Sequence, residues 1–303
     1  MFRKISDIVY TRERLELSDG DFVDLDWLRQ GSKRLMIVTH GLEGSSERHY
    51  SKGMVRYFSR NGWDALAWNC RSCSGEMNRL PRFYHHGATE DLKCVVDYSI
   101  RHGYHEIALV GISMGGSMTL KYLGENSSIL PPQIRAGIAF SVPCDLLSSA
   151  AELDRPGKRF YLNRFLKKLG KKIKVKESMF PGIVSHRGFD QIKSFREFDN
   201  RYTAPLHGFE NADDFYQRAS CLPYLEKIQV PTLLVNAVND PFLTPACYPK
   251  HIASEHPFLF LETPSRGGHT GFSLTGKIEN GMEERALEFA QSNLTVVKSS
   301  SHL

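Results

Sequence analysis

A chain of 303 residues with 41% hydrophobic and 24% charged residues can bury a sizeable core, which excludes an intrinsically disordered protein. The net charge of +5 is modest, and the positive surplus is concentrated between Arg155 and Lys176, so the composition does not favour a nucleic-acid partner. The longest stretch without a charged residue, Ile107 to Leu120, is shorter than the roughly 20 residues that cross a bilayer, and we expect no transmembrane span.

The amino terminus and the cysteines indicate the cellular compartment. Residues 1–7 include an acidic residue and no apolar segment of the kind found in secretory signals, so we expect a cytoplasmic location. The six cysteines are scattered through apolar contexts, which is typical of free, mostly buried thiols. Cys70 and Cys73 form a C-x-x-C pair, and a redox pair or half of a zinc site stays open there as a weaker alternative.

In chain order, the pattern predicts an antiparallel entry hairpin and then apolar strands that alternate with helices. The predicted strands are residues 2–10, 23–28, 34–39, 65–68, 107–112, 136–142, 232–237 and 258–261, and the predicted helices begin near residue 46 or span about 89–101, 114–124 and 281–292. Continuous apolar strands alternating with helices predict a mostly parallel, twisted sheet with helices on both faces. The predicted fold class is therefore α/β.

One long connection interrupts this alternation. We interpret residues 145–228 as a mainly helical cap, inserted within a single domain of residues 1–303, because the connection is too long for a plain loop. Its lysine-rich run is expected to be a solvated helix face, and weak contact with an anionic head group or a membrane surface is the alternative. The lysines are Lys167, Lys168, Lys171, Lys172, Lys174 and Lys176. The aromatic side chains of the cap favour either an apolar pocket or a cap core, and they are Phe160, Tyr161, Phe165, Phe180 and Phe215.

A short apolar run that breaks into Gly111-x-Ser113-x-Gly115 is the most informative motif of the chain. Small residues are required because a strand turns sharply into a helix there, and the turn exposes the serine Oγ. Such a string also occurs by chance, but here it follows a predicted strand and precedes a predicted helix. The setting predicts that Ser113 is a nucleophile on a strand-to-helix elbow.

A serine nucleophile needs a histidine base and a carboxylate that orients the imidazole. Asp240 follows one late apolar strand, and His269 follows the next strand in a glycine-rich turn. The order Ser113, Asp240, His269 is the chain order of a hydrolase built on a parallel sheet, so we expect these three residues to form a catalytic triad. Asp145, which also follows a strand, is the alternative acid.

The oxyanion that develops during acyl transfer needs preorganised N–H donors. We expect one from the amide of Met114, next to the nucleophile, and one from the amide of Leu42 in the loop after an earlier strand. His40 opens this loop, and a buried histidine that braces the loop is favoured over a second catalytic base.

Four further motifs carry a resemblance that extends from about residue 20 to residue 293. They are His40-Gly-Leu-Glu-Gly-Ser-Ser46, Asn69 to Leu80, His86-Gly-Ala-Thr-Glu-Asp91 and Glu197 to Gly208. Together they resemble the YheT-like branch of the α/β-hydrolases, a group of bacterial esterases. The resemblance implies a serine carboxylesterase whose charge relay consists of Ser113, Asp240 and His269. Pro205, His207 and Gly208, inside the predicted cap, are expected to hold a turn against the sheet rather than to touch substrate.

The sequence thus predicts a hydrolase that cleaves carboxylic esters with short- to medium-chain acyl groups through an acyl-enzyme. The substrate is expected to be a small-molecule or lipid-like ester, and the chemistry requires no metal or organic cofactor. Two alternatives stay open. One is a thioesterase or lipase-type hydrolase that uses the same triad, and the other is a non-catalytic protein that binds a ligand on a hydrolase scaffold.

Overall fold

The computed structural model describes residues 3–272 and 279–295 of the chain. Its centre is a sheet with eight strands in the described residues, in the spatial order β1-β2-β4-β3-β5-β6-β7-β8. The strands are β1 (Thr11–Glu16), β2 (Phe22–Leu28), β3 (Arg34–Thr39), β4 (Asp64–Asn69), β5 (Glu106–Ile112), β6 (Ile134–Phe140), β7 (Thr232–Val235) and β8 (Leu259–Glu262). β2 runs antiparallel to both β1 and β4, and all other neighbours are parallel.

Successive residues of the central strands pack on opposite faces of the sheet. Leu35 and Ile37 of β3 join a buried cluster with α2 and α3, whereas Met36 and Val38 join a second cluster with α1 and α10. The helices are α1 (His49–Arg60), α2 (Thr89–Arg101), α3 (Met114–Glu125), α4 (Leu146–Leu153), α5 (Arg159–Met179), α6 (Phe195–Phe198), α7 (Ala204–His207), α8 (Ala212–Ala219), α9 (Lys250–Glu255) and α10 (Gly281–Thr295). Helices on both faces of a mostly parallel sheet confirm the predicted fold class.

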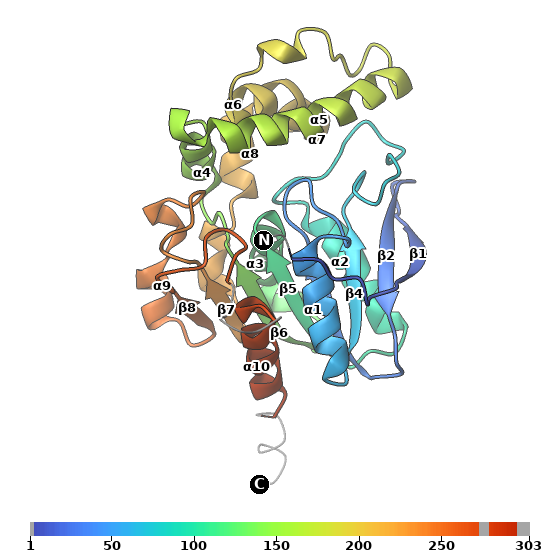
Figure 1. Ribbon diagram of the computed structural model, residues 1–303, viewed down its shortest axis with the longest axis vertical. Helices are drawn as coiled ribbons and strands as arrows, with labels where there is room; N and C mark the ends of the chain where they lie inside the picture. The colour runs from blue at the N-terminus through green and yellow to red at the C-terminus, as the bar shows by residue number, and fades with distance from the viewer. Residues whose placement is uncertain (1–2, 273–278, 296–303) are drawn as a thin grey trace.

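The helices α4 to α8 all lie in the long connection between β6 and β7. Figure 1 shows them as a separate layer at the top of the view, above the sheet and its covering helices. This layer has its own apolar cluster, which includes Leu162, Leu166 and Ile173 of α5. The remainder of the chain therefore builds the sheet, and this segment covers one end of it.

The prediction of the first strand was wrong, although the antiparallel hairpin exists. β1 covers residues 11–16 rather than 2–10, and it is the polar edge of the sheet. Its Arg12 and Arg14 pair with Asp26 and Asp24 of β2 at 2.7 and 2.8 Å. Cross-strand ion pairs of this kind stabilise an edge strand without an apolar repeat, so hydrophobic alternation could not reveal it.

The other boundaries differ from the predictions by a few residues. The helix expected from about Ser46 begins at His49, and α3 continues beyond Gly124 to Glu125. A Cβ at Gly124 would lie 2.8 Å from the carbonyl carbon of Tyr224, so this glycine serves close packing rather than the end of the helix. The strands β6 and β7 both end two residues before their predicted ends.

The lysine-rich run lies on α5, and the prediction of a solvated face is wrong for half of it. Lys168, Lys172 and Lys176 are spaced four residues apart and face the body of the protein, whereas the other three lysines of the run are exposed. Lys176 is fully buried, and its Nζ donates hydrogen bonds to the carbonyl oxygens of Asn78, at 2.8 Å, and Leu80. Burial lowers the pKa of Lys176 to about 8. These two carbonyl acceptors offset part of the free energy that is lost when the Lys176 ammonium group leaves water.

All six cysteines are free thiols, including Cys70 and Cys73 of the C-x-x-C pair. Over the described ranges, no group of three or more metal-ligating side chains comes together. Among the same residues, no helix combines the length and apolar character that a bilayer crossing requires.

Candidate active site

Ser113 lies at the sharp turn between β5 and α3, as the motif predicts. Its backbone has φ 57° and ψ −120°, a region that non-glycine residues seldom adopt. The flanking glycines make the turn possible. A Cβ at Gly111 would lie 2.6 Å from the Cα of Gly116, and a Cβ at Gly115 would lie 2.6 Å from the carbonyl carbon of Thr39. The strand, turn and helix therefore hold Ser113 in a strained backbone conformation.

Ser113, His269 and Asp240 form a continuous chain of hydrogen bonds. The distance between Ser113 Oγ and His269 Nε2 is 2.9 Å, and His269 Nδ1 lies 2.9 and 3.1 Å from the two carboxylate oxygens of Asp240. A carboxylate can only accept, so Nδ1 carries a proton and donates it, which leaves Nε2 of the neutral ring to accept from the serine hydroxyl. The side chain of Asp240 is fully buried, and that of His269 is 18% exposed.

Two short loops fix the acid and the base. The carboxylate of Asp240 also accepts a hydrogen bond from the backbone N–H of Phe242 at 2.9 Å, and the Phe242 ring packs on His269 with 4.3 Å between ring centroids. Asn239 accepts hydrogen bonds from the amides of Gly267 and Gly268 at 3.0 and 2.9 Å. Asn239 thus connects the loop that carries the acid to the loop that carries the base. No sequence pattern indicates this contact.

The alternative acid, Asp145, has a structural role at the start of α4. Asp145 is the N-cap of α4, and its carboxylate accepts a hydrogen bond from the backbone N–H of Ser148 at 2.8 Å. This role is a common one for aspartate at the start of a helix. The structure therefore brings Asp240, and not Asp145, to the imidazole of His269.

The loop after β3 lies directly against the nucleophile. A Cβ at Gly41 would be 3.2 Å from the Cβ of Ser113, so a side chain there would crowd the nucleophile. Met114 is the first residue of α3, and its amide has no acceptor within the helix. Over the described residues, the amide of Leu42 likewise has no acceptor in the protein. The two amides chosen from the sequence are thus available as donors beside Ser113, and their role in catalysis stays a prediction.

His40 braces this loop from within the protein. It is buried, its Nε2 accepts a hydrogen bond from the amide of Cys70 at 3.1 Å, and its Nδ1 donates to the carbonyl oxygen of Gly41 at 2.8 Å. Both ring nitrogens are therefore engaged, which agrees with a structural histidine rather than a second base.

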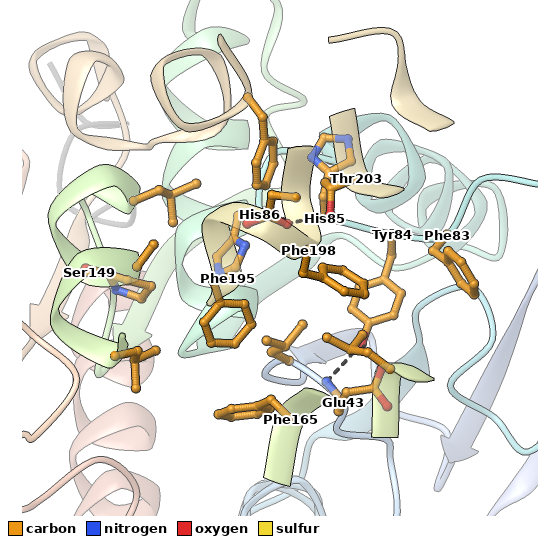
Figure 2. Close-up of a pocket in the computed structure, with 18 of the residues that line it drawn as sticks. Glu43, Phe83, Tyr84, His85, His86, Ser149, Phe165, Phe195, Phe198 and Thr203 are labelled. Carbon is orange, nitrogen blue, oxygen red and sulfur yellow. Dashed lines mark hydrogen bonds between the residues drawn. The ribbon is translucent and has the colours of Figure 1, made fainter. Parts of the chain in front are cut away.

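A cavity lies beside Ser113 and His269, and residues of α4 to α8 form much of its wall. Its walls are largely apolar and aromatic, and they include Leu42, Phe83, Phe165, Phe195, Phe198 and Phe215. Figure 2 shows several of these rings pointing toward one another across the cavity. Among the aromatic residues considered from the sequence, Phe165 and Phe215 line the cavity, Phe180 packs in the cap core and Phe160 is 74% exposed.

The cavity also has a polar wall, which the sequence did not predict. His86 and His207 belong to it, and burial lowers their pKa values to about 4 and about 3, so both rings are neutral at pH 7. His207 was expected only to hold a turn, but it lines the cavity and accepts a hydrogen bond from the amide of Phe83 at 3.4 Å. Gly208, with φ 73°, does end α7 as a turn residue.

Asp199 is the buried carboxylate of this wall. Its oxygens accept hydrogen bonds from the hydroxyls of Thr203 at 2.5 Å and Tyr216 at 2.8 Å. Burial raises its pKa from the ordinary 3.8 to about 7, so the folded protein holds a proton that the unfolded chain has already released. Folding stability is therefore expected to fall as the pH rises from about 4 to about 7.

We expect Asp199→Asn to remove this part of the pH dependence. The variant cannot ionise, so its stability relative to wild type should increase through the same pH range, by up to about 4 kcal/mol. Urea unfolding of both proteins at pH values from 4 to 8 measures the difference. A difference that stays constant over this range would contradict the assignment.

The strand order, the serine elbow after β5 and the acid and histidine after later strands define this chain as an α/β-hydrolase. The family described as serine aminopeptidase S33, Hydrolase_4, matches residues 30–253. The chain belongs to this family.

The relatives include YheT of Escherichia coli strain K12, which is 34% identical over 90% of this chain and 81% of its own length. The human phospholipase ABHD3 is 30% identical over 88% of this chain and 67% of its own. The yeast monoacylglycerol lipase is 30% identical over 80% of this chain and 55% of its own. These similarities confirm the predicted YheT-like resemblance, and they place the chain among the serine hydrolases of the esterase and lipase type.

Solved structures give the same fold at lower identity. The Pyrococcus furiosus esterase Pf2001 superposes with a TM-score of 0.62 and 17% identity, covering 94% of this chain and 93% of its own. Est1E of Butyrivibrio proteoclasticus, solved with ferulic acid, gives a TM-score of 0.59 and 16% identity over 92% of this chain and 98% of its own. At such identities the likeness concerns the fold alone.

Proposed function

We propose that this protein is a serine carboxylesterase that cleaves carboxylic esters through an acyl-enzyme at Ser113. The observation that carries the proposal is the unbroken hydrogen-bond chain from Ser113 through His269 to Asp240 at the base of an apolar cavity. Each member occupies the position that its role requires: a hydroxyl toward the cavity, a ring nitrogen able to take its proton and a buried carboxylate behind the ring.

In the proposed reaction, Ser113 Oγ attacks the ester carbonyl carbon while His269 Nε2 takes the hydroxyl proton. Asp240 stabilises the imidazolium that results, and the amides of Leu42 and Met114 donate to the oxyanion. The tetrahedral intermediate then collapses, and His269 returns the proton to the departing alcohol. Water, deprotonated by the same ring, then attacks the acyl carbon. The bond from that carbon to Ser113 Oγ breaks, His269 returns the proton to Oγ, and the carboxylic acid leaves. Neither a metal nor an organic cofactor takes part in these steps.

The cavity supports an apolar acyl group as part of the substrate. Aromatic and aliphatic side chains from α5 and α6, among them Phe165, Leu169 and Phe195, form its walls. Burial of apolar surface favours an alkyl chain there by about 0.8 kcal/mol for each CH₂ group. We propose short- to medium-chain esters, either small molecules or lipid-like compounds, in line with relatives that are named as a phospholipase and a monoacylglycerol lipase.

Covalent labelling with a fluorophosphonate probe tests this function. The wild-type protein should be labelled, Ser113→Ala should not, and mass spectrometry of the digested protein should place the adduct on Ser113. An unlabelled wild-type protein that retains a ligand unchanged would instead support a non-catalytic binder. Comparing p-nitrophenyl esters, acyl-CoA and anilides at equal concentrations separates an esterase from a thioesterase or an amidase.

We also propose that the exposed side of α5 makes weak contact with anionic lipid surfaces. Lys167, Lys171 and Lys174 are exposed, and among the described residues none of the three forms an ion pair. Each cation near an anionic surface contributes about 1 kcal/mol. Wild-type protein should co-sediment with anionic vesicles more than with phosphatidylcholine vesicles, and replacing the three lysines with glutamine should remove the difference while turnover of a soluble ester stays constant.

A further inference from the structure

The buried side of α5 reaches the loop that carries Leu42. Lys172 Nζ forms an ion pair with Glu43 Oε1 at 2.7 Å, and Lys168 Nζ donates a hydrogen bond to the carbonyl oxygen of Glu43 at 3.1 Å. The side chains of Lys172 and Glu43 are only 16% and 5% exposed. One residue of the loop is thus held by two successive turns of a helix that lies 129 residues further along the chain.

Glu43 is also held from the opposite side, by Tyr84. The Tyr84 hydroxyl accepts a hydrogen bond from the backbone N–H of Glu43 at 2.9 Å and donates one to Glu43 Oε1 at 2.7 Å. Figure 2 shows this ring beside Glu43 at the cavity wall. Arg48 adds a third contact, from its guanidinium to the Glu43 carbonyl oxygen at 2.8 Å. Four side chains therefore converge on a single residue of the loop.

The backbone of Glu43 needs such support. Its φ is 54°, in the left-handed region that non-glycine residues seldom occupy, and this conformation persists only where the surroundings impose it. Glu43 immediately follows Leu42, whose amide has no acceptor in the protein over the described residues. A change in the backbone torsions of Glu43 would rotate the peptide groups beside it and move the Leu42 amide with them.

Stability alone does not explain the ion pair. A buried pair gains little over an apolar pair of similar size, because both ions must leave water. What the pair provides is a defined position for a charged side chain. Here it fixes the strained loop to α5, which contributes Phe165 and Leu169 to the cavity wall.

We propose that Lys172 is a positioning residue: through Glu43 it couples the position of α5 to the placement of the Leu42 amide, so that the oxyanion site is complete only when α5 lies against this loop. This inference rests on the proposed function, because it concerns the donor at Leu42. Its consequence is that a residue of the cap, remote in sequence from the triad, controls the rate of the chemical step rather than the affinity for the substrate.

Lys172→Met tests the proposal, because methionine keeps much of the apolar stem and removes the charge. Loss of a whole oxyanion donor lowers kcat by about 10²- to 10³-fold, and a displaced donor should cost less. We therefore expect kcat for a soluble p-nitrophenyl ester to fall by about 10- to 100-fold with KM changed by less than about threefold. Lys172→Arg should restore most of the rate. Lys250→Met makes the same change at an exposed position of α9, outside the cavity and the cap, so it is the matched control and should leave kcat within about twofold.

A double-mutant cycle distinguishes a loss of the contact between Lys172 and Glu43 from an unspecific disturbance of the structure. Glu43→Gln removes the same ion pair from the loop while keeping an oxygen for Tyr84, so it should lower kcat by a similar factor. Adding Lys172→Met to Glu43→Gln should then cause little further loss. Circular dichroism and thermal unfolding verify folding, and if one single variant fails to fold, the other decides the result.

Several results would overturn the inference. One is an unchanged kcat in Lys172→Met, and another is a change confined to KM, which would make Lys172 a substrate contact. The coupling would also be excluded if the fold-loss of kcat in the double variant equalled the product of the losses in the two single variants. Fluorophosphonate labelling of wild-type Ser113 distinguishes a failure of the proposed function from a failure of the coupling. If the wild-type protein is not labelled, the proposed function is wrong. If it is labelled but kcat does not change in Lys172→Met, only the coupling is wrong.

Discussion

Ser113→Ala is expected to lower kcat for ester hydrolysis by about 10⁴- to 10⁶-fold, the largest effect of any single substitution in this chain. Alanine has no hydroxyl within reach of His269 Nε2, so no acyl-enzyme can form. A small residual rate above that in water should persist, because the cavity and the oxyanion donors remain. Steady-state kinetics with a soluble p-nitrophenyl ester measures the loss, after purification that excludes contaminating esterase.

Ser117→Ala is the matched control for this experiment. Ser117 lies one turn further along α3, is buried, and donates a hydrogen bond to the carbonyl oxygen of Pro143 at 3.1 Å. Its loss should cost about 1 kcal/mol of stability and leave kcat within a few-fold of wild type. If Ser113→Ala retained a tenth of the activity or more, the nucleophile would have to be another group.

Asp240→Asn is expected to lower kcat by about 10⁴-fold, the second largest effect. The carboxylate of Asp240 now accepts the Nδ1 proton of His269, which leaves Nε2 free to accept from Ser113. An asparagine amide in its place can donate to Nδ1, and this favours the tautomer with the proton on Nε2. That tautomer cannot take the serine proton. It also leaves the imidazolium without a compensating charge. The kinetics of the purified variant measure the loss, and circular dichroism verifies the fold.

Asp145→Asn gives the comparison that distinguishes the two candidate acids. Asp145 caps α4 and does not contact His269. Asparagine caps a helix about as well as aspartate, so both the stability and kcat of the variant should stay nearly unchanged. A severe loss of kcat in Asp145→Asn, together with a mild one in Asp240→Asn, would reverse the assignment.

The sequence predicted the parts of the structure that depend on local patterns. The strands β3 and β5, with their uninterrupted apolar residues, were located to within one residue, as was α2. The positions of Ser113, Asp240 and His269 followed from a simple rule. Each comes after its own parallel strand, and parallel strands end at one edge of the sheet. A rule about strand order therefore sufficed to bring together residues that lie 156 positions apart.

Local patterns could not locate the first strand, because Ile5 and Ile8 resemble strand residues but pack in a core cluster outside any strand.

Local patterns also could not predict the contacts that the cap makes with the rest of the protein. The lysines of α5 have the same chemistry in sequence, and only the tertiary placement of the helix decides which of them are buried. Asp199 and Tyr216 likewise lie on different helical segments, so no spacing along the chain reveals that they meet.

The separation between the sheet and the layer of α4 to α8 has a consequence for how this enzyme can be altered. The residues proposed for bond cleavage come from loops after strands of the sheet, whereas much of the cavity wall belongs to the inserted helices. Substitutions at the apolar wall positions of these helices can therefore reshape substrate preference while the reactive groups keep their geometry, as long as Lys168 and Lys172 keep their contacts with Glu43. Laboratory evolution of new specificities would best begin with libraries at Phe165, Leu169 and Phe195, leaving the loops of the sheet untouched.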